Sequence, residues 1–162
     1  MSNGAGTSAA TIAEDLCGAP LSELEAGAWT GFLRVHATLV RDLDDELRER
    51  HGLPLSSYDV LAQLARTDDG RMRMAQLADA VLLSRSGLTR LVARLTDQGL
   101  IERIGCEQDA RGAFAAITEA GRARLDEARE THRAGVRRRF LGRLTDTQQR
   151  QLASAWRRML DE

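Results

Sequence analysis

The segment SRSGLTRLVARL (residues 84–95) has the residue spacing of an amphipathic α-helix. Its apolar residues recur at intervals of three and four and so fall on one helical face; they are Leu88, Leu91, Val92 and Leu95. Ser84 precedes the helix, where its hydroxyl can accept a hydrogen bond from a free backbone N–H, and Gly99 follows it, where a left-handed residue can end it. We therefore expect a helix with one face in the core and a polar face exposed.

A shorter helix is expected over residues 75–81, with residues 82–84 as the turn between the two helices. Two short helices joined so tightly are typical of a helix-turn-helix, whose second helix lies in the major groove of DNA and presents its first residues to the base edges. In this chain those residues are Arg85, Ser86, Thr89 and Arg90. Further on, residues 100–106 and 112–117 are two largely apolar runs around a polar segment, a pattern that predicts a β-hairpin.

These segments resemble the MarR-type winged helix-turn-helix regulators of bacteria. The resemblance rests on four stretches in order, namely residues 83–95, GLIER at 99–103, Asp109-x-Arg111-Gly112, and Thr118-x-x-Gly121. It covers roughly residues 24–160 and implies a mainly α fold with a small β-hairpin wing. The implied organisation is a winged helix-turn-helix over about residues 55–118, flanked by dimerisation helices over about residues 22–51 and 119–162 within a single domain of residues 21–162.

Three arginines on the expected recognition helix are candidates for DNA contact. Arg85 and Arg90 are expected to reach base edges, because a guanidinium can donate two hydrogen bonds to guanine O6 and N7. Arg94 lies one turn after Arg90 and is expected to contact a base or a phosphate. For Arg90 and Arg94 the alternative is a surface ion pair. Hydroxyl groups that can bond to phosphates or bases lie on Ser84, Ser86 and Thr89. Helix capping alone is enough to explain Ser84.

The resemblance assigns a second DNA contact to the tip of the wing. It implies that Arg111 enters the minor groove and that Asp109 pairs with this arginine and holds its orientation. A narrow A·T-rich minor groove concentrates negative potential and so favours an inserted guanidinium.

Charge is distributed unevenly along the chain. The formal net charge of −1 argues against a uniformly basic surface for nucleic acid. Residues 1–50 hold 4 arginines and 9 acidic residues, whereas residues 122–158 hold 11 arginines and 4 acidic residues. All 23 basic residues are arginines, which a codon-usage bias explains. Every cationic side chain is therefore a planar guanidinium that can donate two parallel hydrogen bonds. We interpret the basic C-terminal region as a solvated helix face.

The 162 residues are enough for one domain with its own core. Residues 1–20 are expected to be a disordered tail, without the basic and apolar segments of a signal peptide. No run of 18 apolar residues is present, so no membrane span is expected and a cytoplasmic location is predicted. Cys17 and Cys106 are far apart in the sequence and are expected to be reduced thiols.

The first and last long helices carry more apolar surface than one small core can bury. The first has a continuous seam formed by Trp29, Phe32, Val35, Leu39, Leu43 and Leu47. The last is expected to bury Leu152, Ala155, Trp156, Met159 and Leu160. The resemblance implies that these helices join two copies into a symmetric homodimer. Its two recognition helices would lie about 34 Å apart, one turn of DNA, so the operator should be an imperfect palindrome.

Side-chain caps are expected at the other helices as well. Ser56 or Ser57 is expected to cap the second helix, and Thr118 the helix after the wing. Thr145 and Gln148 have the spacing of a capping box, in which each side chain satisfies the other residue's backbone N–H.

A small-molecule effector is also implied by the resemblance. Members of that family bind aromatic or anionic molecules where the dimerisation helices meet the DNA-binding lobe, and the candidates here are Trp29, Phe32, His36, Tyr58 and Asp59. Trp29 and Asp59 are similar to positions of the branch that senses urate. Residues of these five kinds are more often core or surface residues than ligand contacts. A molecule that prefers the arrangement unable to bind DNA would release the protein, as expected of a repressor.

Other classes of function have less support in the residues. Residues 84–87 lack the flanking glycine of a nucleophile elbow, and three scattered histidines do not form a zinc site, so no catalytic activity, metal or cofactor is expected. One alternative is a redox-responsive regulator of the same fold that uses Cys17 or Cys106, although no basic residue lies near Cys17 in the sequence to activate its thiol. The other is a helical protein-interaction module that does not bind DNA. We predict a ligand-responsive repressor that binds DNA as a homodimer.

Overall fold

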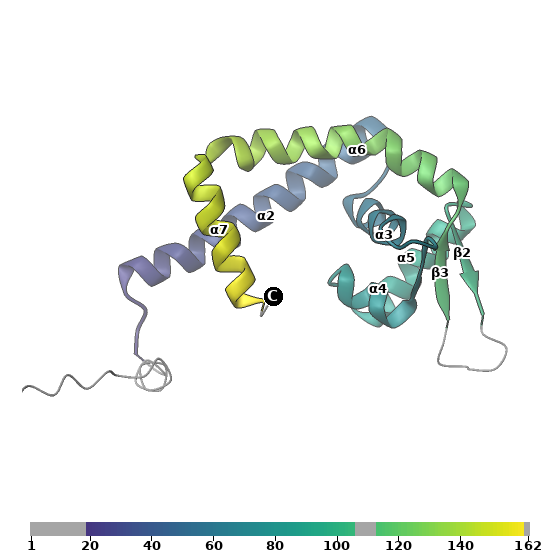
Figure 1. Ribbon diagram of the computed structural model, residues 1–162, viewed down its shortest axis with the longest axis horizontal. Coiled ribbons are helices and arrows are strands. Elements are labelled where there is room, and N and C mark those ends of the chain that lie inside the picture. The colour runs from purple at the N-terminus through teal and green to yellow at the C-terminus, as the bar shows by residue number, and fades with distance from the viewer. Residues whose placement is uncertain (1–18, 106–112, 161–162) are drawn as a thin grey trace, which may run out of the picture. The chain divides into compact units, whose positions relative to one another are not determined.

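The computed structural model describes residues 19–105 and 113–160. Its elements are α2 (Glu23–His51), α3 (Leu55–Ala65), β1 (Arg71–Arg73), α4 (Met74–Ala80), α5 (Arg85–Asp97), β2 (Ile101–Ile104), β3 (Phe114–Ile117), α6 (Glu119–Arg139), the 3-10 helix η1 (Leu141–Arg143) and α7 (Asp146–Met159) (Figure 1). The predicted fold class, mainly α with a small antiparallel sheet, is confirmed. The chain divides into two units between Ala37 and Thr38, inside α2.

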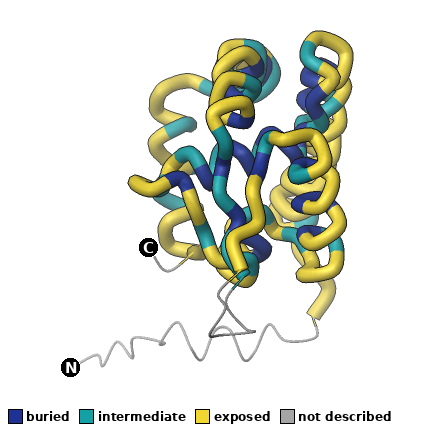
Figure 2. Tube along the Cα trace, turned by 90° about the vertical axis from the view of Figure 1, so that its right-hand side faces the viewer, coloured by how far each residue is buried: buried dark blue, intermediate teal, exposed yellow. Residues whose placement is uncertain are grey.

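The core of the second unit is shared by α3, α4, α5, α6 and the sheet. Leu61, Leu77, Leu88 and Leu125 come from these four helices, and each is at most 1% exposed. Figure 2 shows the buried segments of the chain in dark blue. Burial of one such side chain contributes about 1.5–3 kcal/mol, so the four helices are held mainly by this common apolar centre.

The sheet has one strand more than the sequence analysis predicted. β2 and β3 form the predicted hairpin, and β1 pairs with β3 on its other side, giving the antiparallel order β1-β3-β2. Phe114 is paired with Arg73 on one side and with Ile104 on the other. β1 was missed because it has only three residues and because its partner strand lies far along the chain.

Of the three caps predicted for helices other than α5, two are confirmed and one is wrong. Thr118 Oγ1 accepts a hydrogen bond from Gly121 N at 3.0 Å, and Thr145 and Gln148 form the reciprocal capping box. Neither Ser56 nor Ser57 caps α3, which begins after Pro54 without a cap from its own side chains. Its first residue, Leu55, donates its N–H to Asp44 Oδ1 of α2 at 2.7 Å. The carboxylate of a neighbouring helix therefore caps α3.

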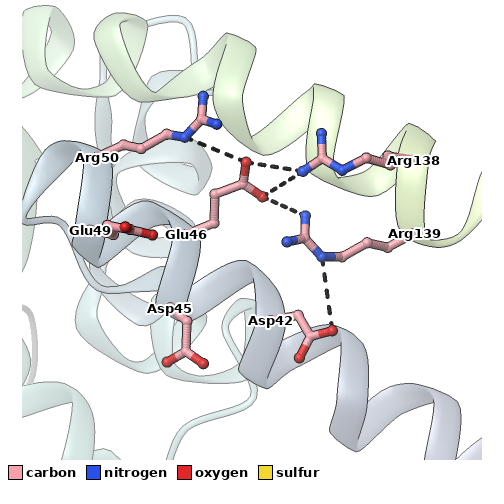
Figure 3. Close-up of a pocket in the computed structure, with 7 residues that line it drawn as sticks. All are labelled: Asp42, Asp45, Glu46, Glu49, Arg50, Arg138 and Arg139. Atoms are coloured by element: carbon pink, nitrogen blue, oxygen red, sulfur yellow. Dashed lines mark hydrogen bonds and ion pairs between the residues drawn. The ribbon is translucent and has the colours of Figure 1, made fainter.

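A cluster of ion pairs joins α2 to α6 (Figure 3). Glu46 of α2 is only 9% exposed, and its carboxylate accepts hydrogen bonds from Arg138 Nη2 at 2.8 and 3.0 Å and from Arg139 Nη1. Arg50 Nε lies 3.6 Å from Glu46 Oε1. Burial alone would raise the pKa of Glu46, but the bonds from Arg139 and Arg138 outweigh it, so the net pKa lies below the ordinary value. These contacts stabilise the ionised carboxylate between the two helices.

The last helix differs from its predicted environment. None of the residues of α7 is buried in the single chain, and Met159 and Leu160 are 70% and 66% exposed. The sequence analysis correctly predicted the apolar stripe, but this stripe lies at the surface. In the described segments, no helix combines the length and apolar character needed to cross a bilayer.

Glu46→Gln is expected to lower the free energy of unfolding by about 1–3 kcal/mol, because it removes the charge that Arg138 and Arg139 neutralise. The loss stays below that of a fully buried pair, since the Arg138 side chain is 54% exposed. Urea unfolding followed by circular dichroism measures the change. Asp45→Asn is the control, because Asp45 lines the same pocket and is exposed. An equal loss in both variants would contradict this role for the ion pairs.

Candidate nucleic-acid interface and effector pocket

Helix α5 separates an apolar face from a polar one. Ser84 Oγ accepts a hydrogen bond from Gly87 N at 3.1 Å, which fixes the first turn, and Gly99 follows the helix with a φ of +71°. The predicted apolar stripe is buried, and it consists of Leu88, Leu91, Val92 and Leu95. Because this stripe holds the helix in the core, the opposite face is left at the surface.

The exposed face of α5 is basic. Arg85, Arg90 and Arg94 are all exposed, and within residues 19–105 and 113–160 none of them makes a hydrogen bond or an ion pair through its side chain. The neighbouring hydroxyls are partly used locally, since Thr89 Oγ1 donates to Arg85 O at 2.8 Å and Ser86 Oγ lies 3.3 Å from Ser84 Oγ. The three guanidinium groups therefore keep their donors available for an anionic partner.

The turn between α4 and α5 positions this face. Leu83 N donates to Ala78 O at 3.0 Å, while Leu77 and Ala78 of α4 are buried against the core. Leu82 has a φ of +54°, a left-handed conformation that costs a non-glycine residue roughly 1–2 kcal/mol. The tight turn of the predicted helix-turn-helix is thus formed even though no glycine is present at this position.

The tip of the wing lies outside the described residues. It includes Asp109 and Arg111, which the sequence analysis assigned to the minor groove, and Cys106. Cys17 lies outside them as well. The assigned roles of these four residues stay predictions.

The effector candidates lie on two helices. On α2, the Trp29 and Phe32 rings and the Phe32 and His36 rings have centroids 6.1 Å apart in each case, so the three side chains follow one helical face. They belong to the N-terminal unit. Tyr58 and Asp59 lie on α3, in the second unit.

Tyr58 and Asp59 line a pocket of about 460 Å³ between α3 and α6. The Tyr58 ring stacks on His132 of α6 with centroids 4.3 Å apart. The other lining residues are Ala62, Gln63, Ala65, Arg66, Arg129, His132 and Arg133. The pocket therefore combines an aromatic wall with three arginines and one carboxylate, a composition that suits an aromatic anion.

Burial changes the acidity of the groups in this pocket. It raises the pKa of Asp59 to about 6, although the charge of Arg66 opposes the shift. It also raises the pKa of the Tyr58 hydroxyl and lowers that of His132. Near neutral pH the imidazole of His132 is thus neutral. The carboxylate of Asp59 becomes protonated when the pH falls through about 6.

The sequence analysis missed the arginines of this pocket. Arg66 follows α3, whereas Arg129 and Arg133 are one turn apart on α6, so only the packing of α3 on α6 brings them together. The spacing of Arg129, His132 and Arg133 on one helical face was the available signal. The sequence analysis instead interpreted these arginines as part of a solvated helix face.

Asp59→Asn is expected to raise the melting temperature at a pH well above 6 and to leave it unchanged below 3.8. The folded protein holds the Asp59 proton more tightly than the unfolded chain, so the contribution of this group is full below its unfolded pKa and is lost as the pH rises through about 6. Melting curves across this range measure the difference. Asp44→Asn is the opposite control, because the pKa of Asp44 is lowered in the fold and this variant should lose stability above 3.8. A pH-independent effect of Asp59→Asn would contradict the assignment.

Known proteins share both the sequence pattern and the fold. The profile of the MarR family matches residues 51–112. The structure of Sco3205, a MarR family transcriptional regulator from Streptomyces coelicolor in complex with DNA, is 32% identical, covers 88% of this chain and 92% of that chain, and has a TM-score of 0.81. CouR from Rhodococcus jostii RHA1, bound to p-coumaroyl-CoA, is 29% identical with a TM-score of 0.68 and covers 80% of this chain and 90% of that chain.

Curated relatives match over a shorter stretch. An HTH-type transcriptional regulator of Bacillus cereus is 34% identical over 86 residues, which cover 53% of this chain and 55% of that protein. The match thus spans about half the length of the curated relative. The helix-turn-helix, the wing sheet and the identity to Sco3205 over most of both chains together show that this chain belongs to the MarR family of transcriptional regulators.

Proposed function

We propose that the protein is a DNA-binding transcriptional regulator that inserts α5 into the major groove. The observation that carries this proposal is the exposed basic face of Arg85, Arg90 and Arg94, which no acidic side chain in the described residues neutralises. Arg85 and Arg90 lie in the first two turns of α5, from which side chains can reach base edges. Arg94 lies one turn further, where its side chain would reach the backbone phosphates. The complex of the related Sco3205 with DNA supports the same use of the fold.

We assign a second contact to the wing. β2 and β3 form the hairpin from which the segment with Asp109 and Arg111 extends. In this proposal Arg111 enters the minor groove beside the site read by α5, and Asp109 orients it.

The binding species in this proposal is a homodimer on an imperfect palindrome. Apolar side chains are exposed along the first half of α2 and along α7, including Leu33, Val35, Met159 and Leu160. Burial of such surfaces against a second copy removes apolar area from water and places two recognition helices in two-fold symmetry. A regulator that meets chromosomal DNA in this way acts in the cytoplasm.

The effector of this regulator is an aromatic organic anion that binds between α3 and α6. Arg66, Arg129 and Arg133 can hold its charged group, and the stacked Tyr58 and His132 form a surface for its ring. The related CouR was solved with p-coumaroyl-CoA, a ligand that carries both an aromatic ring and phosphates. Trp29, Phe32 and His36 of α2 stay predicted effector contacts.

Effector binding would act on DNA affinity through α3. This helix is followed by the turn at Gly70, whose φ is +69°, and then by β1 and α4, so a shift of α3 against α6 moves the start of the helix-turn-helix. An effector that prefers the shifted arrangement lowers DNA affinity by the ratio of its affinities for the two arrangements. A regulator that an effector releases from its operator in this way acts as a repressor.

A gel-shift assay with labelled DNA from beside the protein's own gene tests the proposal. At low salt we expect a retarded band that survives competition by unrelated DNA. Salicylate, urate and p-coumaroyl-CoA are then added separately, and we expect the band to be lost with an aromatic anion that fits the pocket. If no DNA is retarded at any salt concentration, the fold serves as an interaction module and the proposal is wrong.

Arg90→Ala is expected to weaken specific DNA binding at least about tenfold, because each half-site loses a contact that is worth about 1–3 kcal/mol. Helicity should stay unchanged, since the exposed face of α5 is not part of the core. Fluorescence anisotropy with the labelled operator measures the affinity. Arg124→Ala is the matched control, because it removes the same charge from α6, where Arg124 is paired with Glu127. Equal losses in the two variants would mean that general charge, not α5, determines binding.

Arg133→Ala is expected to abolish the response to the anionic effector while leaving the affinity for DNA intact. At about 100 times its dissociation constant an effector stabilises the folded protein by about 2.7 kcal/mol, which a thermal-shift assay detects. Arg137→Ala is the control, because Arg137 lies one turn further along α6 and does not line the pocket. A full thermal shift in Arg133→Ala would exclude this pocket as the effector site.

A further inference from the structure

Arg73 occupies a distinctive place at the end of strand β1. It is the last residue of the strand and is paired with Phe114, which is paired in turn with Ile104. This row is the end of the sheet where β2 stops and β3 begins, here called the wing end of the sheet. Arg73 also directly precedes α4, the first helix of the helix-turn-helix. It therefore lies where the sheet of the wing joins the helix-turn-helix.

The side chain of Arg73 is exposed and held by an aromatic ring. Its Cζ lies 4.9 Å from the centre of the Phe114 ring. Stacking on a ring occupies the flat face of a guanidinium but leaves its N–H groups, which lie in the plane, free to donate. Within residues 19–105 and 113–160 no carboxylate is paired with Arg73. The ring thus orders a cation whose donors are available.

Arg71 shows what a structural arginine on the same strand looks like. It lies on the same face of β1 two residues earlier, and its Cζ is 5.9 Å from the Phe114 ring. Its Nε, however, is paired with Asp69 Oδ2 at 2.5 Å, and it lies at the opposite end of the strand, beside Ala116. Arg73 differs from Arg71 in two ways. No carboxylate of residues 19–105 and 113–160 neutralises its charge, and it lies at the wing end of the sheet.

We propose that Arg73, ordered by Phe114, is an anchor for a DNA backbone phosphate at the base of the wing. This inference rests on the proposed function and adds a contact to it. A guanidinium held against a ring loses little rotational freedom when a phosphate binds, and its donors can grip two phosphate oxygens. The anchor carries no sequence information, because phosphates are the same at every base pair, and it fixes the position of the wing hairpin on the duplex.

The test compares Arg73→Ala, Arg71→Ala and Phe114→Leu in the full-length chain by fluorescence anisotropy over a series of salt concentrations. Arg73→Ala should weaken binding to the operator and to unrelated DNA by the same factor, about threefold to tenfold at low salt. Its plot of log affinity against log salt should be shallower by about two for a dimer, since each copy loses one phosphate contact. Arg71→Ala should leave affinity and slope unchanged. Phe114→Leu keeps the charge, so it should weaken binding without changing the slope.

The outcomes separate this inference from the proposed function. If the unmodified protein binds no DNA, the proposed function fails and the anchor with it. If the unmodified protein binds and Arg73→Ala keeps both its affinity and its salt dependence, only the anchor is wrong. A loss in Arg73→Ala that is confined to the operator would make Arg73 a base-reading residue and would likewise overturn the proposal. Melting curves of the three variants establish that each is folded.

Discussion

The burial of one face of α5 is the constraint on which the candidate DNA-binding surface depends. Leu88, Leu91, Val92 and Leu95 together contribute several kcal/mol of apolar burial and so fix the rotation of the helix about its axis. A helix whose rotation is fixed in this way presents a constant polar face. The arginines on that face are exposed, so water solvates their charges in the free protein. A bound polyanion such as DNA would replace this water.

Helix α6 connects several parts of this arrangement. Its first turn comes so close to Leu100, the residue before β2, that an added Cβ at Gly121 would overlap Leu100 O. Its middle carries Arg129, His132 and Arg133 of the pocket, and Thr131 Oγ1 lies 2.8 Å from His51 Nε2 of α2. Its end is paired with Glu46. A ligand bound in the proposed pocket between α3 and α6 would therefore contact a helix that is held at both ends.

Much of the fold could be predicted because its signals are local. The stripe and cap of α5 and the capping box at Thr145 each depend on residues a few positions apart, and the structure confirms them. The missed features depend on distant parts of the chain: Asp44 caps α3 from another helix, and β1 needs β3 as its partner. The same holds for the candidate site. The arginines of α5 follow from one helix, whereas the pocket forms only when Arg66 of one segment meets Arg129 and Arg133 of another.

The central claim is that the exposed face of α5 meets DNA directly. The Nε–H signals of arginine side chains in a nitrogen–proton correlation spectrum, recorded while operator DNA is added, report on this contact most directly. The account predicts that the signals of Arg85, Arg90 and Arg94 shift and exchange more slowly with water, while the signal of Arg124 on α6 keeps its position. Shifts confined to arginines of α6, with those of α5 unchanged, would contradict it.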